Sequence, residues 1–166
     1  MQMLQAIALC PKCASKNLKW ESGSVSCIDC GTRFERSGEF VDFVDSGSLS
    51  ELEFTALEVW GDDLHAEALA APAHFIQVEA LFPDLWQSCL KGKVLEIGCG
   101  SGTDTVRLSK AHGSIALFSF DLGSNVAALS RKFSDHGNVQ IFRANALHVP
   151  IQDNMMDMVY SFGLNI

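Results

Sequence analysis

The sequence predicts an α/β protein: a partial, doubly wound parallel sheet of four strands that follows a small cysteine-rich unit. From residue 93 onward, short apolar strands alternate with helical segments across short loops, the pattern of a parallel sheet with right-handed crossovers. Before residue 46, two Cys-x-x-Cys pairs stand in a stretch too short to be stable on its own core. With 166 residues, 48% of them hydrophobic, the chain can form one ordinary domain and a small one.

Charge and composition divide the chain into three units. We expect a cysteine-rich unit over residues 1–46, an acidic helical linker or cap over 47–92, and the α/β unit over 93–166. The formal net charge is −8, and the middle unit holds one basic and eight acidic side chains. A nucleic-acid or anionic-membrane surface would need a basic face, so the composition argues against both partners.

The sequence also indicates where in the cell the protein is expected. No apolar run approaches the roughly 18 residues that a membrane span needs. The first ten residues lack the basic segment and the cleavage site of a signal peptide. We therefore expect a cytoplasmic protein, in which six cysteines indicate metal ligands or buried thiols before disulfides.

Four cysteines have the spacing of a metal site. Cys10 pairs with Cys13 and Cys27 pairs with Cys30, so each pair can turn both sulfurs to one side of a tight loop. Two such loops make a tetrahedral thiolate site, for which zinc is the expected ion. Four cysteine ligands leave no position for water, which predicts a structural role. A redox Cys-x-x-Cys is the alternative, but it would not need the second pair.

The residues after the second pair carry a family resemblance. Gly38, Asp42 and Phe43 follow an aromatic stretch, and over about residues 6–45 the sequence resembles small zinc-ribbon domains related to a methyltransferase-activating subunit. Such ribbons often precede bacterial methyltransferase domains. The resemblance implies a docking or scaffolding role, with a possible protein partner bound through the ribbon.

The middle unit reads as helical. The clearest helix runs over residues 73–82, with Pro72 in its first turn, and Pro83 breaks or kinks it before a further turn or two. The acids around Asp62 and Asp63 are expected to form a solvated face. In the α/β unit the expected strands are 94–97, 115–121, 139–143 and 156–162, and the expected helices are 103–111 and 123–136.

The most informative segment is the glycine-rich loop after the first of these strands. A strand that runs into Gly-x-Gly-x-Gly and then a helix lets the backbone approach a nucleoside or an amino acid closely. The dinucleotide pattern fails because the last glycine falls one residue early, at Gly102, and no Lys-Ser/Thr pair follows for a phosphate loop. Asp121 ends the next strand about 20 residues on, where a carboxylate can accept the ribose hydroxyls.

Together with the segments 143–150 and 153–161, these elements resemble class I S-adenosylmethionine-dependent methyltransferases of the methyltransferase-11-like kind, over about residues 75–166. The resemblance implies a Rossmann-like fold with S-adenosylmethionine as the cofactor. By position, the glycine loop would hold the methionine end, Glu96 would anchor the loop and Asp121 would bind the ribose. Leu122 would cover one adenine face, and Asn145 with the Ala146 backbone N–H would read the adenine edge. The implied cofactor residues are Glu96, Gly98, Cys99, Gly100, Gly102, Asp121, Leu122, Asn145 and Ala146.

Several of these residues have structural alternatives. Asn145 stands where the family usually has Asp, and an uncharged acceptor makes a weaker hydrogen bond, so a modestly reduced affinity is expected. Asn145 and Asp121 could be turn residues, and Glu96 could simply brace its loop. Cys99, like Cys89, could be a small buried residue without special reactivity.

Two classes of function follow. The first is methyl transfer from S-adenosylmethionine to a small-molecule or glycan acceptor, with this chain as the cofactor-binding portion; RNA is a subsidiary possibility. The second is a non-catalytic zinc-ribbon scaffold with a degenerate nucleoside pocket. A methyl sulfonium is already activated, so alignment of the acceptor matters most, and no catalytic base can be assigned. Because the family continues beyond the fourth strand, we expect a C-terminally truncated fragment of a longer enzyme.

Overall fold

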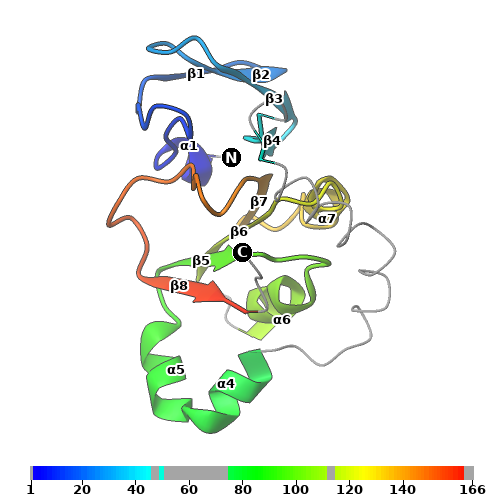
Figure 1. Ribbon diagram of the computed structural model, residues 1–166. Coiled ribbons are helices and arrows are strands. Elements are labelled where there is room, and N and C mark those ends of the chain that lie inside the picture. The colour runs from blue at the N-terminus through cyan, green and yellow to red at the C-terminus, as the bar shows by residue number, and fades with distance from the viewer. Residues whose placement is uncertain (1, 46–48, 51–74, 112–114, 163–166) are drawn as a thin grey trace.

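The computed structural model describes residues 2–45, 49–50, 75–111 and 115–162 (Figure 1). The strands within these ranges form one eight-stranded sheet. The strand order is β1-β2-β3-β4-β7-β6-β5-β8. The strands are β1 (Leu18–Trp20), β2 (Ser24–Cys27), β3 (Arg33–Ser37), β4 (Phe40–Asp42), β5 (Lys93–Ile97), β6 (Ala116–Asp121), β7 (Val139–Arg143) and β8 (Met158–Ser161). The helices are α1 (Gln2–Gln5), α4 (Phe75–Leu81), α5 (Pro83–Cys89), α6 (Thr103–Ala111) and α7 (Val126–Lys132).

The second half of the chain forms the predicted parallel α/β unit. Strands β7, β6, β5 and β8 are adjacent in that order and all parallel, so in order of sequence they run third, second, first and fourth. Helix α6 connects β5 to β6, and α7 connects β6 to β7. This is the strand order of a Rossmann-like half, whose ligands bind beyond the carboxyl ends of the strands where the order reverses. That point lies between β5 and β8.

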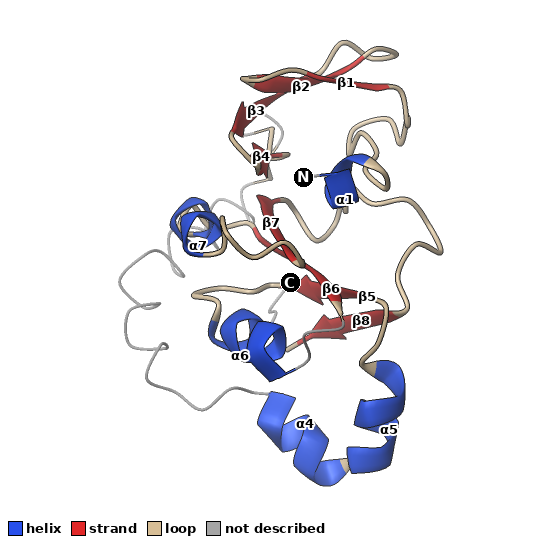
Figure 2. Ribbon diagram, turned by 180° about the vertical axis from the view of Figure 1, so that it is seen from behind, coloured by secondary structure: helices blue, strands red, loops and turns tan. Residues whose placement is uncertain are grey.

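Each face of the sheet is covered by different elements. On one face, Leu108 of α6 and Leu129 of α7 join a core with Leu117 of β6. On the other face, Phe118 of β6 joins a core that contains Leu4 of α1 and the apolar residues of the cysteine-rich unit. The strand β6 is buried along both faces because its residues alternate between these two cores. Figure 2 shows α6 and α7 together on one side of the sheet, away from α1.

The cysteine-rich unit extends the same sheet. Strands β1 to β4 form an antiparallel meander, and β4 then pairs in parallel with β7, with Asp42 opposite Arg143. The Gln140 side chain on β7 adds a hydrogen bond, donating from Nε2 to the Glu39 backbone oxygen at 2.9 Å. The rings of Phe43 and Phe142 lie 6.1 Å apart, edge to face, across this junction. The two units that the sequence suggests one after the other are therefore joined side by side.

The helical segment before β5 matches its expected pattern in part. Helix α4 ends at Leu81 and α5 begins at Pro83, so proline does interrupt the helix. Trp86 of α5 is buried and contacts Tyr160 of β8, with ring centroids 5.9 Å apart. Pro72 and the acids at Asp62 and Asp63 lie outside the described residues. Among the described residues, no helix is both long enough and apolar enough to cross a membrane.

The second crossover helix is shorter than the sequence suggests. We expected a helix over 123–136, but α7 spans Val126–Lys132. The segment before α7 is a turn in which Gly123 donates its backbone N–H to the Asp121 carboxylate at 2.9 Å. That hydrogen bond keeps residue 123 out of the helix. After α7 the chain again forms turns, in which His136 donates its backbone N–H to Phe133.

Candidate cofactor site and metal site

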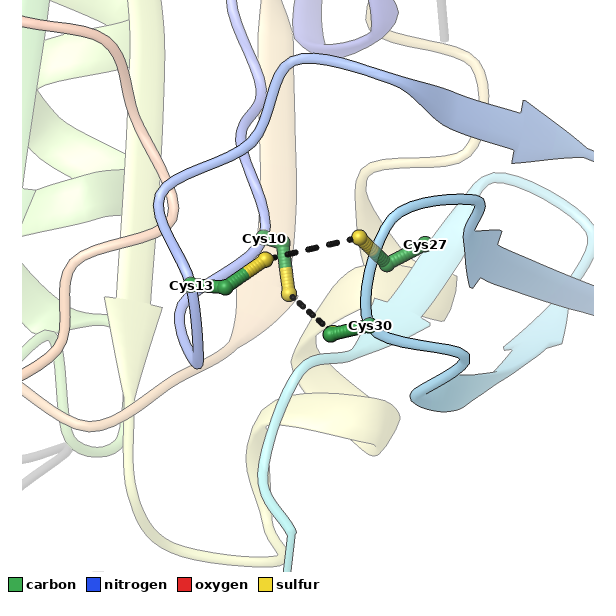
Figure 3. A group of neighbouring side chains, drawn as sticks. All are labelled: Cys10, Cys13, Cys27 and Cys30. Carbon is green, nitrogen blue, oxygen red and sulfur yellow. Dashed lines mark hydrogen bonds between the residues drawn. The ribbon is translucent and has the colours of Figure 1, made fainter.

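The four cysteines of the Cys-x-x-Cys pairs meet at one point. Their sulfur atoms all lie within 4.8 Å of one another, and Figure 3 shows the side chains pointing toward a common centre. The Sγ atoms of Cys10 and Cys30 are 3.7 Å apart, and those of Cys13 and Cys27 are 3.6 Å apart. A tetrahedral zinc site with Zn–S bonds of about 2.3 Å has sulfur–sulfur edges of about 3.8 Å. The four thiols therefore fit a tetrahedral metal ion.

The two cysteine loops repeat one backbone geometry. Cys10 donates its backbone N–H to Ser15 and Cys27 donates to Thr32, both at 2.8 Å. The residue after each second cysteine, Ala14 or Gly31, donates back to the first cysteine. Both of these residues have positive φ, 57° for Ala14 and 75° for Gly31. Only glycine adopts this conformation without steric cost, so the first loop carries a strain that the second avoids.

The glycine loop leaves β5 in an unusual backbone conformation. Gly98, Gly100 and Gly102 all have positive φ, at 77°, 51° and 82°. The N–H groups of Gly98 and Cys99 both donate to the Phe120 oxygen of β6. The loop is thereby held at the carboxyl end of β6, beside the place where β6 ends in Asp121.

Gly102 differs from the other two glycines in what surrounds it. A Cβ atom at this position would lie 2.4 Å from Cδ1 of Leu129 on α7. The absence of a side chain therefore lets α6 and α7 pack closely over the sheet. The positive φ of Gly102 adds a second requirement for glycine at this point.

Asp121 is bonded directly to the glycine loop. Its Oδ2 accepts the backbone N–H of Gly100 at 2.8 Å, and its Oδ1 accepts that of Gly123 at 2.9 Å. Its backbone oxygen accepts the N–H of Ala144 at 3.1 Å. Residues that follow three different strands therefore meet around Asp121, and its carboxylate retains lone pairs for a further donor.

Asn125 belongs to the same cluster and is absent from the sequence-based site. Its Nδ2 donates to the Gly100 oxygen at 3.0 Å. Its Oδ1 is buried without a hydrogen-bond partner among the described residues. Asparagine before a helix usually indicates an N-cap, but this side chain makes no cap hydrogen bond. A buried unpaired amide oxygen is costly and marks a place where a ligand donor would be favourable.

Glu96 is buried beneath the loop and is only 2% exposed. Its Oε2 accepts hydrogen bonds from Thr105 of α6 at 2.6 Å and from Ser119 of β6 at 2.7 Å. Burial raises the pKa of Glu96 to about 7, the two hydroxyl donors lower it, and the nearby Asp104 carboxylate raises it. The carboxylate thus ties α6 to β6, which is the bracing arrangement that the sequence left open.

The hydrogen bond of Asn145 and the burial of Cys99 are both typical of residues with a structural role. The Asn145 Oδ1 accepts the backbone N–H of Leu147 at 2.9 Å, an arrangement typical of asparagine in turns. Cys99 is buried, and burial raises the pKa of its thiol well above the usual value, so it has little thiolate character. The adenine role of Asn145 stays a prediction.

Two further polar pairs lie near the site. Tyr160 of β8 donates its hydroxyl to Asp104 of α6 at 2.8 Å, and burial raises the pKa of that hydroxyl. Arg143 of β7 donates from Nε to the Leu122 oxygen at 2.7 Å. Neither pairing has a spacing signal in the sequence, because each joins residues from separate strands and loops.

A cavity of about 360 Å³ lies elsewhere, between the β3–β4 turn, α7 and β7. None of the residues expected to bind the cofactor lines it. Its lining residues are Ser37, Gly38, Glu39, Phe40, Ala127, Ser130, Arg131, Phe133, Ser134, Val139, Gln140 and Ile141.

Part of the chain is similar in sequence to known methyltransferases. Residues 94–166 match the family described as "Methyltransferase domain". The chain is 35% identical over 75 residues to demethylmenaquinone methyltransferases of Staphylococcus saprophyticus and Staphylococcus aureus. The alignment covers 43% of this chain, and 32% and 31% of those proteins, so the chain spans about a third of the length of the curated relatives it matches.

Similar solved structures include a protein described as a sarcosine dimethylglycine methyltransferase from Galdieria sulphuraria. It has a TM-score of 0.42 and 19% identity, over 68% of this chain and 48% of its own. A coclaurine N-methyltransferase bound to N-methylheliamine and SAH gives a TM-score of 0.37 and 14% identity, over 63% of this chain and 32% of its own. Both TM-scores are low, and the topology described above does not rest on them. Residues 94–166 are thus similar in sequence to a methyltransferase domain, and the described strands β5 to β8 have the parallel order of a Rossmann-like half.

Proposed function

We propose that the chain binds S-adenosylmethionine beyond the carboxyl ends of β5, β6 and β7 and serves as the cofactor-binding portion of a methyltransferase. The observation that carries the proposal is the hydrogen bond from the Gly100 backbone N–H to the Asp121 carboxylate. It places an acidic acceptor directly against a loop in which three of the five residues, Gly98, Gly100 and Gly102, carry no side chain. A sulfonium cofactor with a ribose diol needs both features in one place.

The residue roles follow from this geometry. Gly98 and Gly100 would line the methionine end, and Asp121 would accept the ribose hydroxyls. Leu122, with Asn145 and the backbone of Ala146, would enclose the adenine, as the family resemblance implies. The buried Oδ1 of Asn125 supports an addition to this set, because it offers a second acceptor beside Gly100. Glu96, Cys99 and Gly102 would support the loop from below.

For the methyl acceptor, we propose a small molecule. The names of the two matched relatives indicate demethylmenaquinone as their acceptor, which supports a small molecule over a glycan. In this proposal the matched region binds the cofactor, so specificity for the acceptor would depend on other segments. Because the sulfonium methyl group is already activated, the chemistry needs alignment of the acceptor more than it needs a base.

For the N-terminal region, we propose a structural zinc ion held by Cys10, Cys13, Cys27 and Cys30. The sulfur geometry described above supports zinc, and four thiolates leave no open coordination position. The chain would then consist of a ribbon over 1–46, a linker or cap over 47–92 and the methyltransferase portion over 93–166. Ile28, at the tip of the second cysteine loop, is 69% exposed and supports a protein partner at the ribbon.

Calorimetric titration of the zinc-loaded chain with S-adenosylhomocysteine tests the cofactor site. We expect one binding site per chain, and at least a tenfold loss of affinity in Asp121→Ala, because the ribose acceptor and the loop contact are both removed. Asp135→Ala is the matched control, since Asp135 is exposed in the turn before β7. The proposal fails if the folded wild-type chain releases no binding heat, or if both variants bind equally well.

A further inference from the structure

Arg143 connects two parts of the molecule that lie far apart in the sequence. Its Nε donates to the backbone oxygen of Leu122 at 2.7 Å. Its Nη1 lies 2.9 Å from Oδ2 of Asp42, in the last strand of the ribbon. The backbone oxygen of Arg143 also accepts the N–H of Phe43 at 2.8 Å. One guanidinium thus bridges the ribbon and the turn at the carboxyl end of β6.

The turn that Arg143 holds is the one that presents Asp121. Leu122 lies between Asp121, whose carboxylate contacts the glycine loop, and Gly123, whose N–H donates back to that carboxylate. The Leu122 carbonyl lies in the same peptide plane as the Gly123 N–H, so the hydrogen bond from Arg143 also holds the N–H that donates to Asp121. Loss of the Arg143 hydrogen bond would free this peptide plane to rotate and would weaken the contact of Gly123 with the Asp121 carboxylate.

The guanidinium suits this bridging role. It is planar and always charged, and it offers its donors in a rigid fork, so it can hold two acceptors at a fixed angle. Asp42 and Arg143 are partly buried, with side chains 23% and 19% exposed, which limits screening by solvent. The Asp42 Oδ1 in turn accepts the backbone N–H of Val44 at 3.0 Å, so the carboxylate is itself held in place.

We propose that Arg143 is a positioning residue for the cofactor: it holds the Leu122 carbonyl, and with it the turn 121–123, in the orientation that binds the nucleoside, while Asp42 fixes the guanidinium. The inference rests on the proposed function, since it assigns the nucleoside to this turn. It assigns Arg143 no contact with the cofactor. Cofactor affinity would then depend on a side chain in the ribbon.

The competing explanation is that Arg143 only joins β4 to β7. In that case its replacement would lower the stability of the junction but leave the affinity of the folded protein unchanged. The two explanations differ at lysine. Arg143→Lys can keep the ion pair with Asp42, but its single ammonium nitrogen cannot occupy both the Nε and the Nη1 positions from which arginine reaches Leu122 and Asp42.

The experiment measures the dissociation constants of S-adenosylhomocysteine and of methylthioadenosine, which lacks the amino-acid end, by calorimetry on the zinc-loaded full chain. We expect Arg143→Lys to weaken both ligands by about tenfold, the value of a charge-assisted hydrogen bond. Asp42→Asn should weaken both by about threefold, and Asp42→Glu should restore most of that loss. Arg131→Lys, on the exposed face of α7, is the matched control and should bind as the wild type does.

Each outcome decides between the explanations. Equal affinities for wild type, Arg143→Lys and Asp42→Asn would overturn the positioning role while leaving the proposed cofactor site intact. Failure of the wild-type chain to bind S-adenosylhomocysteine would overturn the proposed function, and the positioning role with it. If Arg143→Lys does not fold, the pair Asp42→Asn and Asp42→Glu decides: loss with rescue supports the inference, and no loss contradicts it.

Discussion

The backbone N–H of Gly100 donates to the Asp121 carboxylate at 2.8 Å. This contact joins the loop after β5 to the end of β6, so the carboxylate is positioned before any ligand arrives. Preorganisation of this kind lowers the entropic cost of binding. It also means that Asp121 has two functions in the proposed site, holding the loop and accepting the ribose.

Replacement of Asp121 by asparagine should separate these functions. The amide retains one oxygen acceptor, for the Gly100 N–H, but its NH2 group then faces the Gly123 N–H without accepting from it. The negative charge is also lost, and uncharged acceptors make weaker hydrogen bonds. We expect Asp121→Asn to bind S-adenosylhomocysteine about tenfold more weakly and, because the Gly123 contact is lost, to lower the thermal unfolding midpoint by about 2–4 °C. Calorimetry and differential scanning calorimetry measure the two quantities. An unchanged affinity would mean that the charge plays no part in binding.

The cysteine cluster predicts one tightly bound zinc ion per chain. Cys27→Ser should lose zinc and unfold the ribbon, because a structural zinc site contributes much of the folding free energy of a small unit. Cys89→Ser is the matched control, since Cys89 lies on α5 outside the cluster. Elemental analysis gives the zinc content, and the absorption of the cobalt-substituted protein reports the tetrahedral thiolate geometry. Equal zinc in both variants would refute the assignment.

The positive φ of Ala14 and of Gly31 predicts that Ala14→Gly and Gly31→Ala change the free energy of unfolding in opposite directions. Ala14 has a φ of 57°, which costs an L-residue about 1–2 kcal/mol, partly offset because glycine gains entropy in the unfolded chain. Ala14→Gly should therefore raise the free energy of unfolding by about 0.5 kcal/mol. Gly31→Ala should lower it by about 1 kcal/mol, because Gly31 has a φ of 75°. Denaturant unfolding of the zinc-loaded protein measures both, and changes of the same sign would contradict the shared geometry.

Buried Glu96 predicts a dependence of stability on pH. Its pKa is raised from 4.5 to about 7, so between these values the folded protein keeps a proton that the unfolded chain has lost. Its contribution to stability is complete below pH 4.5 and is lost as the pH rises through about 7. The shift corresponds to about 3 kcal/mol.

The comparison with Glu96→Gln isolates this contribution. Glutamine can accept the hydrogen bonds of Thr105 and Ser119 through its side-chain oxygen but does not ionise. We expect the variant to gain stability relative to wild type as the pH rises from 5 to 8. The zinc ligands titrate in both proteins, so their contribution cancels in the difference. A difference that stays constant across this range would show that Glu96 is ionised throughout.

The α/β unit could be predicted from the sequence because its signals are local. Helix α6 and strand β7 have the expected bounds, and the parallel order of β5 to β8 follows from alternating apolar strands and helices. The position of Asp121 next to Gly100 also follows, because parallel strands end at one edge of the sheet. These features need only short-range patterns and the handedness of crossovers.

The junction between the ribbon and the α/β unit could not be predicted in this way. Asp42 and Arg143 are 101 residues apart, and the pairing of two strand edges leaves no periodic pattern in either segment. Asn125 was missed for a different reason: it falls inside the helix expected over 123–136, whereas it lies just before α7 and its amide contacts the Gly100 oxygen. In both cases tertiary contacts decided between arrangements that local sequence allows equally.

The most direct test of the central claim is an NMR titration of the zinc-loaded, ¹⁵N-labelled chain with S-adenosylhomocysteine. We predict saturable shifts at the amides of Gly98, Gly100 and Gly102 and of the turn 121–123, with Gly31 of the second cysteine loop unchanged. The proposed cofactor site would be contradicted if the amides of a folded protein did not move, or if the shifts gathered around the cavity between α7 and the β3–β4 turn.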